Sequence, residues 1–180
     1  METQLTKTKW VSDPAHSELM FKVRHLMISN VKGEFRKFSV EIDGDDFRKD
    51  PVRVEIETGS VYTNDDSRDQ HLKAADFFDA ENHPSMLFQS ESIEPTGESS
   101  YKLNGILNIK GVEKPASLHL DFNGTNKDPW GNEKAGFSLS GSINRSDWGL
   151  SWNAPLETGG FLVSDQVNIQ GEIQLIRKEG

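Results

Sequence analysis

The sequence predicts an all-β protein in which eight antiparallel strands close into an extended barrel, with one short helix near the barrel mouth. Three observations predict this fold class. Apolar and polar residues alternate with a period of two through most of the chain, which is typical of strands with one buried face. Turn-forming residues separate the alternating runs. Several apolar rows carry a glycine at their centre, which a barrel tolerates better than a sandwich core does.

Eight alternating runs are expected to form the strands. In the first half of the chain the inward rows are apolar except for one histidine: Leu19, Phe21, Val23, His25 and Met27; Phe38, Val40 and Ile42; Val52, Val54 and Ile56; Met86 and Phe88. In the second half the rows are Tyr101, Leu103, Gly105, Leu107 and Ile109; Ala116, Leu118, Leu120 and Phe122; Phe137, Leu139, Gly141 and Ile143; Val167, Ile169, Gly171, Ile173 and Leu175.

Turns are expected between these strands wherever glycine, proline, asparagine and aspartate gather. The segments concerned are 43–46, 94–97, 110–115, 123–124 and 128–131. The stretch 151–160 has no alternation, so we expect a long loop there.

The segment 64–79 interrupts the alternation and predicts a helix. Acidic residues suit its first turns, and apolar residues then recur at helical spacing at Leu72, Ala75 and Phe78. The adjacent rings of Phe77 and Phe78 either cover the barrel mouth or serve only to dock the helix.

Four apolar rows have a central glycine, in the segments 31–35, 103–107, 139–143 and 169–173. Such a glycine can simply allow a strand to coil, or it can leave space inside the barrel. Four of them together favour an unfilled interior, and an eight-stranded barrel is wide enough for one small ligand.

The composition restricts the possible functions. A chain of 180 residues is one domain, and no apolar run reaches the roughly 20 residues of a membrane-spanning helix. The net charge of -9 disfavours nucleic acid and anionic membranes unless basic residues cluster locally. There is no cysteine, hence no disulfide and no cysteine metal site. The start of the chain lacks a secretory signal, so we expect a cytoplasmic protein, or a periplasmic one if a signal has been removed.

The sequence contains no catalytic motif, no phosphate-binding glycine loop and no metal-ligand spacing among its histidines. We therefore expect no catalytic residue, no metal and no required cofactor. His25 shares a row with Phe21 and Val23, where it is either a core histidine with its hydrogen bonds satisfied or a donor to a ligand headgroup.

Several separated motifs occur in order and together resemble the YceI-like family of polyisoprenoid-binding, lipocalin-like proteins. They comprise Trp10, Asp13, His16, Ser17, Phe21, Val23, His25 and Leu26; Ser29, Val31, Gly33 and Phe35; Arg68, Asp69, His71, Leu72, Phe77, Phe78, Asp79 and Ala80, with His83 and Pro84; Gly105, Leu107, Ile109 and Gly111; and Ile143, Arg145, Asp147, Trp148, Gly149, Ser164, Asp165, Val167 and Ile169.

The resemblance implies one lipocalin-like barrel domain over the whole chain, with its core at about 8–176, whose lumen binds a polyisoprenoid, an isoprenoid quinone or a fatty-acyl lipid. It also implies a possible homodimer. For a pyrophosphate head, Arg68 and His71 match the family motif, whereas a neutral head would need only hydrogen bonds from His25 and His71. The residues expected to contact the ligand are Phe21, Val23, His25, Phe35, Phe38, Val40, Ile42, Val54, Ile56, Arg68, His71, Phe77, Phe78, Phe88, Leu103, Gly105, Leu107, Phe137, Leu139, Gly141, Ile143 and Ile169.

Three functions follow from these observations. The favoured one is non-enzymatic binding, storage or transport of a long amphiphilic lipid. The alternative is an enzyme that acts on a small apolar substrate through His25, Arg68, Asp69 or His71. A filled barrel with a purely structural role is the third.

Overall fold

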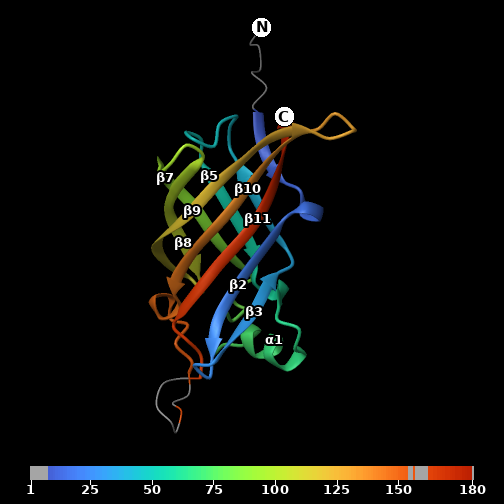
Figure 1. Ribbon diagram of the computed structural model, residues 1–180. Coiled ribbons are helices and arrows are strands. Elements are labelled where there is room, and N and C mark those ends of the chain that lie inside the picture. The colour runs from blue at the N-terminus through green and yellow to red at the C-terminus, as the bar shows by residue number, and fades with distance from the viewer. Residues whose placement is uncertain (1–7, 154–155, 157–161, 180) are drawn as a thin grey trace.

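The computed structural model describes residues 8–153, 156 and 162–179, and its strands form a single closed sheet (Figure 1). The strands are β1 (Thr8–Ser12), β2 (Glu18–His25), β3 (Ser29–Phe35), β4 (Phe38–Ile42), β5 (Val52–Glu57), β6 (Val61–Tyr62), β7 (Ser85–Pro95), β8 (Ser100–Ile109), β9 (Val112–Lys127), β10 (Glu133–Asn144) and β11 (Gln166–Glu179). The helices are α1 (Asp66–Lys73) and the short 3-10 turns η1 (Pro14–His16), η2 (Thr58–Ser60) and η3 (Arg145–Trp148).

The 11 strands of the sheet correspond to the expected antiparallel meander of eight, because three long strands are each interrupted once. The halves are β1 with β2, β3 with β4, and β5 with β6, and each half pairs with the matching half of its neighbour. β11 closes the barrel by pairing with both β1 and β2. The predicted fold class is therefore confirmed.

The interruption between β1 and β2 is fixed by polar contacts to β10 and β11. The Asp13 amide donates to the Gln174 carbonyl at 2.8 Å, and the Ser17 hydroxyl bonds both backbone groups of the same residue. Lys134 donates to the Asp13 carboxylate at 2.8 Å. These contacts replace the ladder bonds that the strand loses where it bends.

Cross-strand register places the predicted inner rows inside the barrel. Phe21 faces Gly33, Phe88 faces Leu107, and Leu139 faces Leu120 on neighbouring strands. The buried apolar residues form two clusters, one around Phe47 and one beside α1. The start of β1 and the end of β11 lie at the end of the barrel opposite α1 (Figure 1).

Several predicted boundaries were wrong. Met27 lies in the β2–β3 turn rather than in a strand, and it is 54% exposed. Segment 123–124 is not a turn but part of β9, where Gly124 adopts a φ of 106° opposite Gly136, next to a register shift. The turn expected at 110–115 is only Lys110 and Gly111, because both residues adopt positive φ.

The predicted helix 64–79 is also shorter than expected, because α1 ends at Lys73. Ala74 has extended backbone angles, and the amides of Phe78 and Ala80 bond the last free carbonyls of the helix at Leu72 and Lys73. The predicted loop 151–160 lies largely outside the described residues. No helix in the described part of the chain is long and apolar enough to cross a membrane.

Candidate functional site

The candidate site is a cavity of about 560 Å³ inside the barrel, lined mainly by apolar side chains. This volume falls within the range of small-molecule binding sites. On β11 the lining runs from Val167 to Leu175, which is about 26 Å along the strand at about 3.3 Å per residue. A long, narrow, apolar cavity suits a chain-like molecule better than a compact one.

The structure brings nearly all the residues expected at the site to this one cavity. Those in its wall are Phe21, Val23, His25, Phe35, Phe38, Val40, Ile42, Val54, Ile56, Arg68, His71, Phe77, Phe78, Phe88, Leu103, Leu107, Phe137, Leu139, Ile143 and Ile169. Gly105 and Gly141 are not part of the wall.

The glycines do not leave the space that their positions suggested. A Cβ placed on Gly105 would lie 2.4 Å from the Gln89 carbonyl oxygen and 2.6 Å from the Phe88 ring, and one on Gly33 would meet the Phe21 ring. Neighbouring side chains therefore already occupy the room above these glycines. Glycine instead lets the aromatic rings lie against the barrel wall, which keeps them out of the centre of the lumen.

One end of the cavity is closed by an aromatic cluster centred on Phe47. Its ring lies 4.9 Å from that of Phe137, 5.1 Å from Phe122 and 5.2 Å from Tyr101. The Arg48 guanidinium lies 4.5 Å above the Phe47 ring on the outer side. Because Phe47 stands alone in a polar loop, alternation could not identify it, although a single large aromatic in such a loop is itself unusual.

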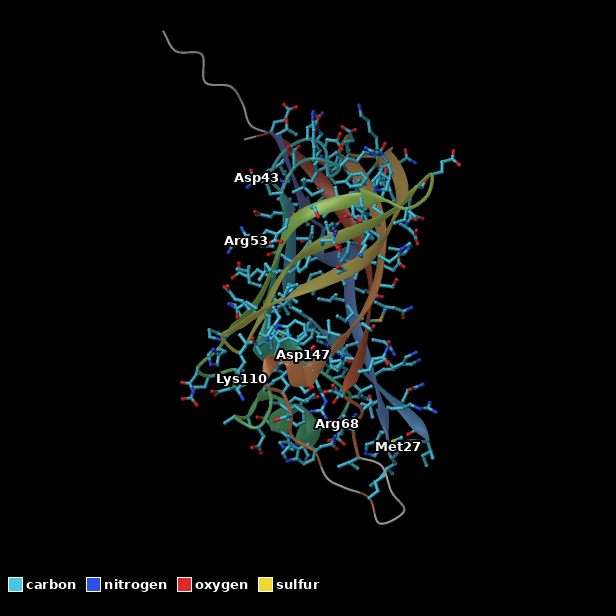
Figure 2. All side chains as sticks on the ribbon, turned by 90° about the vertical axis from the view of Figure 1, so that its left-hand side faces the viewer. Met27, Asp43, Arg53, Arg68, Lys110 and Asp147 are labelled. Carbon is cyan, nitrogen blue, oxygen red and sulfur yellow. The ribbon has the colours of Figure 1, made fainter. Side chains whose placement is uncertain are left out.

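The other end of the cavity is its mouth, where the polar lining residues gather beside α1. These residues are His25, Thr63, Asp65, Ser67, Arg68, His71 and Arg145. Figure 2 shows Arg68 at this end of the barrel and Asp43 at the opposite end. The cavity is therefore apolar in its interior and polar at its mouth. This arrangement matches a molecule that has an apolar tail and a polar head.

Arg68 is held at the mouth by Thr63. Its Nε donates to the Thr63 hydroxyl at 2.8 Å and its Nη2 to the Thr63 carbonyl at 2.6 Å. The same hydroxyl donates to the buried carboxylate of Asp69. In the described part of the chain Nη1 has no protein partner, so this nitrogen can donate to a ligand.

His71 belongs to an aromatic group at the mouth. Its ring packs edge-on against Trp152 at 4.7 Å and against Phe77 at 5.0 Å, and its Nε2 lies 3.5 Å from the Asp76 carboxylate. Phe78 packs on Phe35 at 5.8 Å. The two phenylalanines therefore both dock their segment and line the cavity.

His25 ends β2 at the same mouth, bridged through its backbone to Val163. It is half-buried, and within the described residues its imidazole has no hydrogen-bond partner. Among the described residues nothing bonds the imidazole, so its role as a donor to a headgroup stays a prediction.

Arg145 is the most important residue that the sequence analysis did not place at the site. It is only 5% exposed, and it donates to the carbonyls of Leu150, Trp152, Ser164 and Val163 at 2.6 to 3.3 Å. Burial lowers the pKa of the guanidinium below its usual value, opposed by the nearby Asp165. Arg145 therefore holds two backbone segments together at the mouth, 150–152 and 163–164.

The residues of the alternative enzyme hypothesis fall into separate groups at the mouth. Arg68 and Asp69 bond Thr63, and His71 faces Asp76. Among the described residues no hydrogen bond joins the His25 side chain to any of them. In the same residues no three side chains of histidine, aspartate or glutamate come together as a metal site requires.

Known proteins resemble this chain over most of its length. The family model for the YceI-like domain matches residues 10–175. A UPF0312 protein of Staphylococcus aureus is 35% identical over 170 residues, which cover 93% of this chain and 96% of that protein.

Solved structures share the fold. The YCEI protein of Campylobacter jejuni is 37% identical, with a TM-score of 0.74 over 88% of this chain and 91% of that one. A polyisoprenoid-binding domain from Saccharophagus degradans is 15% identical, with a TM-score of 0.67 over 97% of this chain and 100% of that one. At that identity the second likeness concerns the fold alone.

Proposed function

Because the chain belongs to the YceI-like family, we propose that it binds one long amphiphilic lipid without enzymatic turnover, with the tail in the lumen and the polar head beside α1. The observation that carries this proposal is the polarity of the cavity, which is apolar from the Phe47 cluster onward and polar only at the mouth. A polyisoprenoid, an isoprenoid quinone or a fatty-acyl lipid has the matching shape. The polyisoprenoid-binding domain from Saccharophagus degradans, which shares the fold, supports the isoprenoid class.

Tail burial supplies most of the affinity in this proposal. Each buried methylene contributes about 0.8 kcal/mol, which corresponds to about a fourfold gain in affinity. The lining residues offer hydrocarbon contact without directional bonds, so the tail gives little specificity. Selection among lipids then depends on the mouth, where Arg68, His71 and His25 offer donors.

Arg68 with His71 favours an anionic head, whereas His25 and His71 suffice for a neutral one. Arg68 Nη1 is the donor that a phosphate or carboxylate would use at the mouth. We favour an anionic head, because Thr63 already orients the guanidinium.

A chain-length series tests the proposed function. Binding of prenyl or alkyl phosphates of increasing length is measured by calorimetry on delipidated protein. Affinity should rise by up to about fourfold per methylene and then level off when the tail reaches the Phe47 cluster. The matching neutral alcohols should bind more weakly, and Arg68→Gln should remove that difference. Affinity that does not depend on tail length would overturn the proposal.

A further inference from the structure

The β2–β3 turn presents an apolar tip to solvent. Leu26 is 40%, Met27 54% and Ile28 78% exposed, and all three are adjacent in sequence. Figure 2 shows Met27 at the same end of the barrel as Arg68. Contiguous exposed apolar residues of this size mark an interaction surface more often than isolated ones do.

Folding alone does not explain these residues. Leu26 and Met27 adopt φ values of 53° and 64°, in the left-handed region, and the Ile28 amide closes the turn on the His25 carbonyl. Glycine or asparagine suits such positions, whereas large side chains there cost conformational energy. The chain therefore keeps bulky apolar residues at a turn where smaller polar ones would fold better.

The part of the β2–β3 hairpin nearest the tip is basic although the protein is strongly acidic, and the two acidic residues of the hairpin, Glu18 and Glu34, lie at the far ends of its strands. Between Leu19 and Gly33 the hairpin carries Lys22, Arg24 and Lys32 and no acidic residue, in a chain of net charge -9. Acidic residues of this end lie on α1 beside Arg68, and also at Asp147 and Asp165 near η3, so the basic surface is confined to the hairpin. A local basic surface around an apolar tip is complementary to an anionic lipid interface.

The tip is joined directly to the cavity mouth. The Leu26 amide donates to the Leu162 carbonyl at 2.9 Å, and His25 pairs with Val163. Leu162, Val163 and His25 all line the cavity. Any partner surface to which the tip binds would therefore lie next to the cavity mouth.

We propose that the β2–β3 tip docks the protein on anionic lipid bilayers, with Leu26, Met27 and Ile28 inserted at the interface and the basic hairpin residues against the headgroups. This surface goes beyond lipid binding in the lumen and does not require it. If the lumen also binds lipid, docking places the mouth against the bilayer from which that lipid is exchanged.

The test is co-sedimentation with vesicles of phosphatidylcholine containing about 30 mol% phosphatidylglycerol, at about 0.15 M salt. The protein should bind these vesicles at least about tenfold more tightly than pure phosphatidylcholine, and high salt should weaken binding. The triple variant Leu26→Asn, Met27→Gly, Ile28→Ser should lose about tenfold or more in binding. Because these residues suit the turn, the variant should unfold at the same or a higher urea concentration than wild type.

Trp130→Ser is the matched control. Trp130 is 82% exposed but lies in the β9–β10 turn, so its loss should leave vesicle binding unchanged. Wild-type protein that ignores anionic vesicles, or a triple variant that binds them equally well, would overturn the proposal. A wild-type dimer that the triple variant converts to a monomer would overturn it too, since a second copy would then cover the tip. Native mass spectrometry of the triple variant measures separately whether a lipid occupies the lumen. Loss of vesicle binding can therefore be distinguished from loss of lipid binding in the lumen.

Discussion

At the scale of single residues, two charged side chains fix the backbone around the barrel. Arg145 binds four carbonyls at the mouth, and Asp13 joins the β1–β2 interruption to Lys134 on β10. Sequence patterns could not identify either role, because each depends on tertiary contacts, from Arg145 to the carbonyls of Val163 and Ser164 and from Asp13 to Lys134. His25 was identified by its row, since a polar residue among inward apolar neighbours stands out by parity alone.

Arg145→Lys should destabilise the protein by about 2 kcal/mol, because one ammonium cannot reach the carbonyls that the planar guanidinium spans. Urea unfolding measures this loss. Arg53→Lys, on the outward face of β5, is the control and should change stability by less than about 0.5 kcal/mol. Equal effects of the two changes on stability would contradict the role of the Arg145 guanidinium in holding the four carbonyls.

The Asp13 carboxylate gives stability a defined pH dependence. Hydrogen bonds from Lys134 and then His16 lower the pKa of Asp13 from 3.8 to about 2. Because the folded pKa lies below the unfolded one, the stabilisation is complete above about pH 4 and is lost as the pH falls toward 2.

Asp13→Asn should therefore be less stable than wild type at pH 6 by about 1 kcal/mol, and the difference should vanish near pH 2. The free energy of unfolding measured by denaturant titration at several pH values checks this. Asparagine can still accept the Ala15 amide, but its amide nitrogen replaces the oxygen that Lys134 and His16 contact, so the change removes the charge together with these two contacts. A difference that persists unchanged at pH 2 would show that charge is not the cause.

At the scale of elements, alternation predicted the strands because every strand has one buried and one wet face. The helix was overestimated because Leu72, Ala75 and Phe78 satisfy helical spacing although the chain turns at Ala74. Beyond this bend, Phe77 and Phe78 both reach the cavity wall. The local spacing of apolar residues does not show where tertiary packing bends the chain.

Strand glycines should respond to substitution according to their surroundings. Gly105→Ala should cost about 2 kcal/mol or more, because its Cβ would press on the Gln89 carbonyl and the Phe88 ring. Gly136→Ala, with only Asn123 at 3.6 Å, should be neutral or slightly stabilising. Thermal unfolding compares the two, and equal tolerance at both positions would contradict the role of Gly105.

At the scale of the whole molecule, the closed barrel combines a hollow apolar interior with a strongly acidic exterior of net charge -9. The sequence predicted the closure and the hollow interior, but it assigned the hollow to missing glycine side chains. The cavity depends instead on the packing of rings against the wall and on the ends, where Phe47 and Arg145 belong to segments without alternation.

Filling the lumen should separate ligand binding from folding. Ala116 is half-buried and lines the cavity, so Ala116→Trp should place an indole in the lumen and reduce lipid affinity by about tenfold or more. Ser117→Trp adds the same ring to the outer face of β9 and should leave affinity unchanged. Calorimetry with a long-chain prenyl phosphate makes the comparison, and unaltered binding by Ala116→Trp would place the ligand elsewhere.

The central claim is that one lipid tail enters at α1 and ends at the Phe47 cluster. Photo-crosslinking with two prenyl phosphates, which carry a diazirine at the tail end or beside the head, tests this orientation through peptide mapping. The tail probe should label Phe47, Ile42 or Phe137, and the head probe should label Arg68, His71 or Trp152. Identical labelling by both probes, or labelling confined to the outer surface, would contradict the claim.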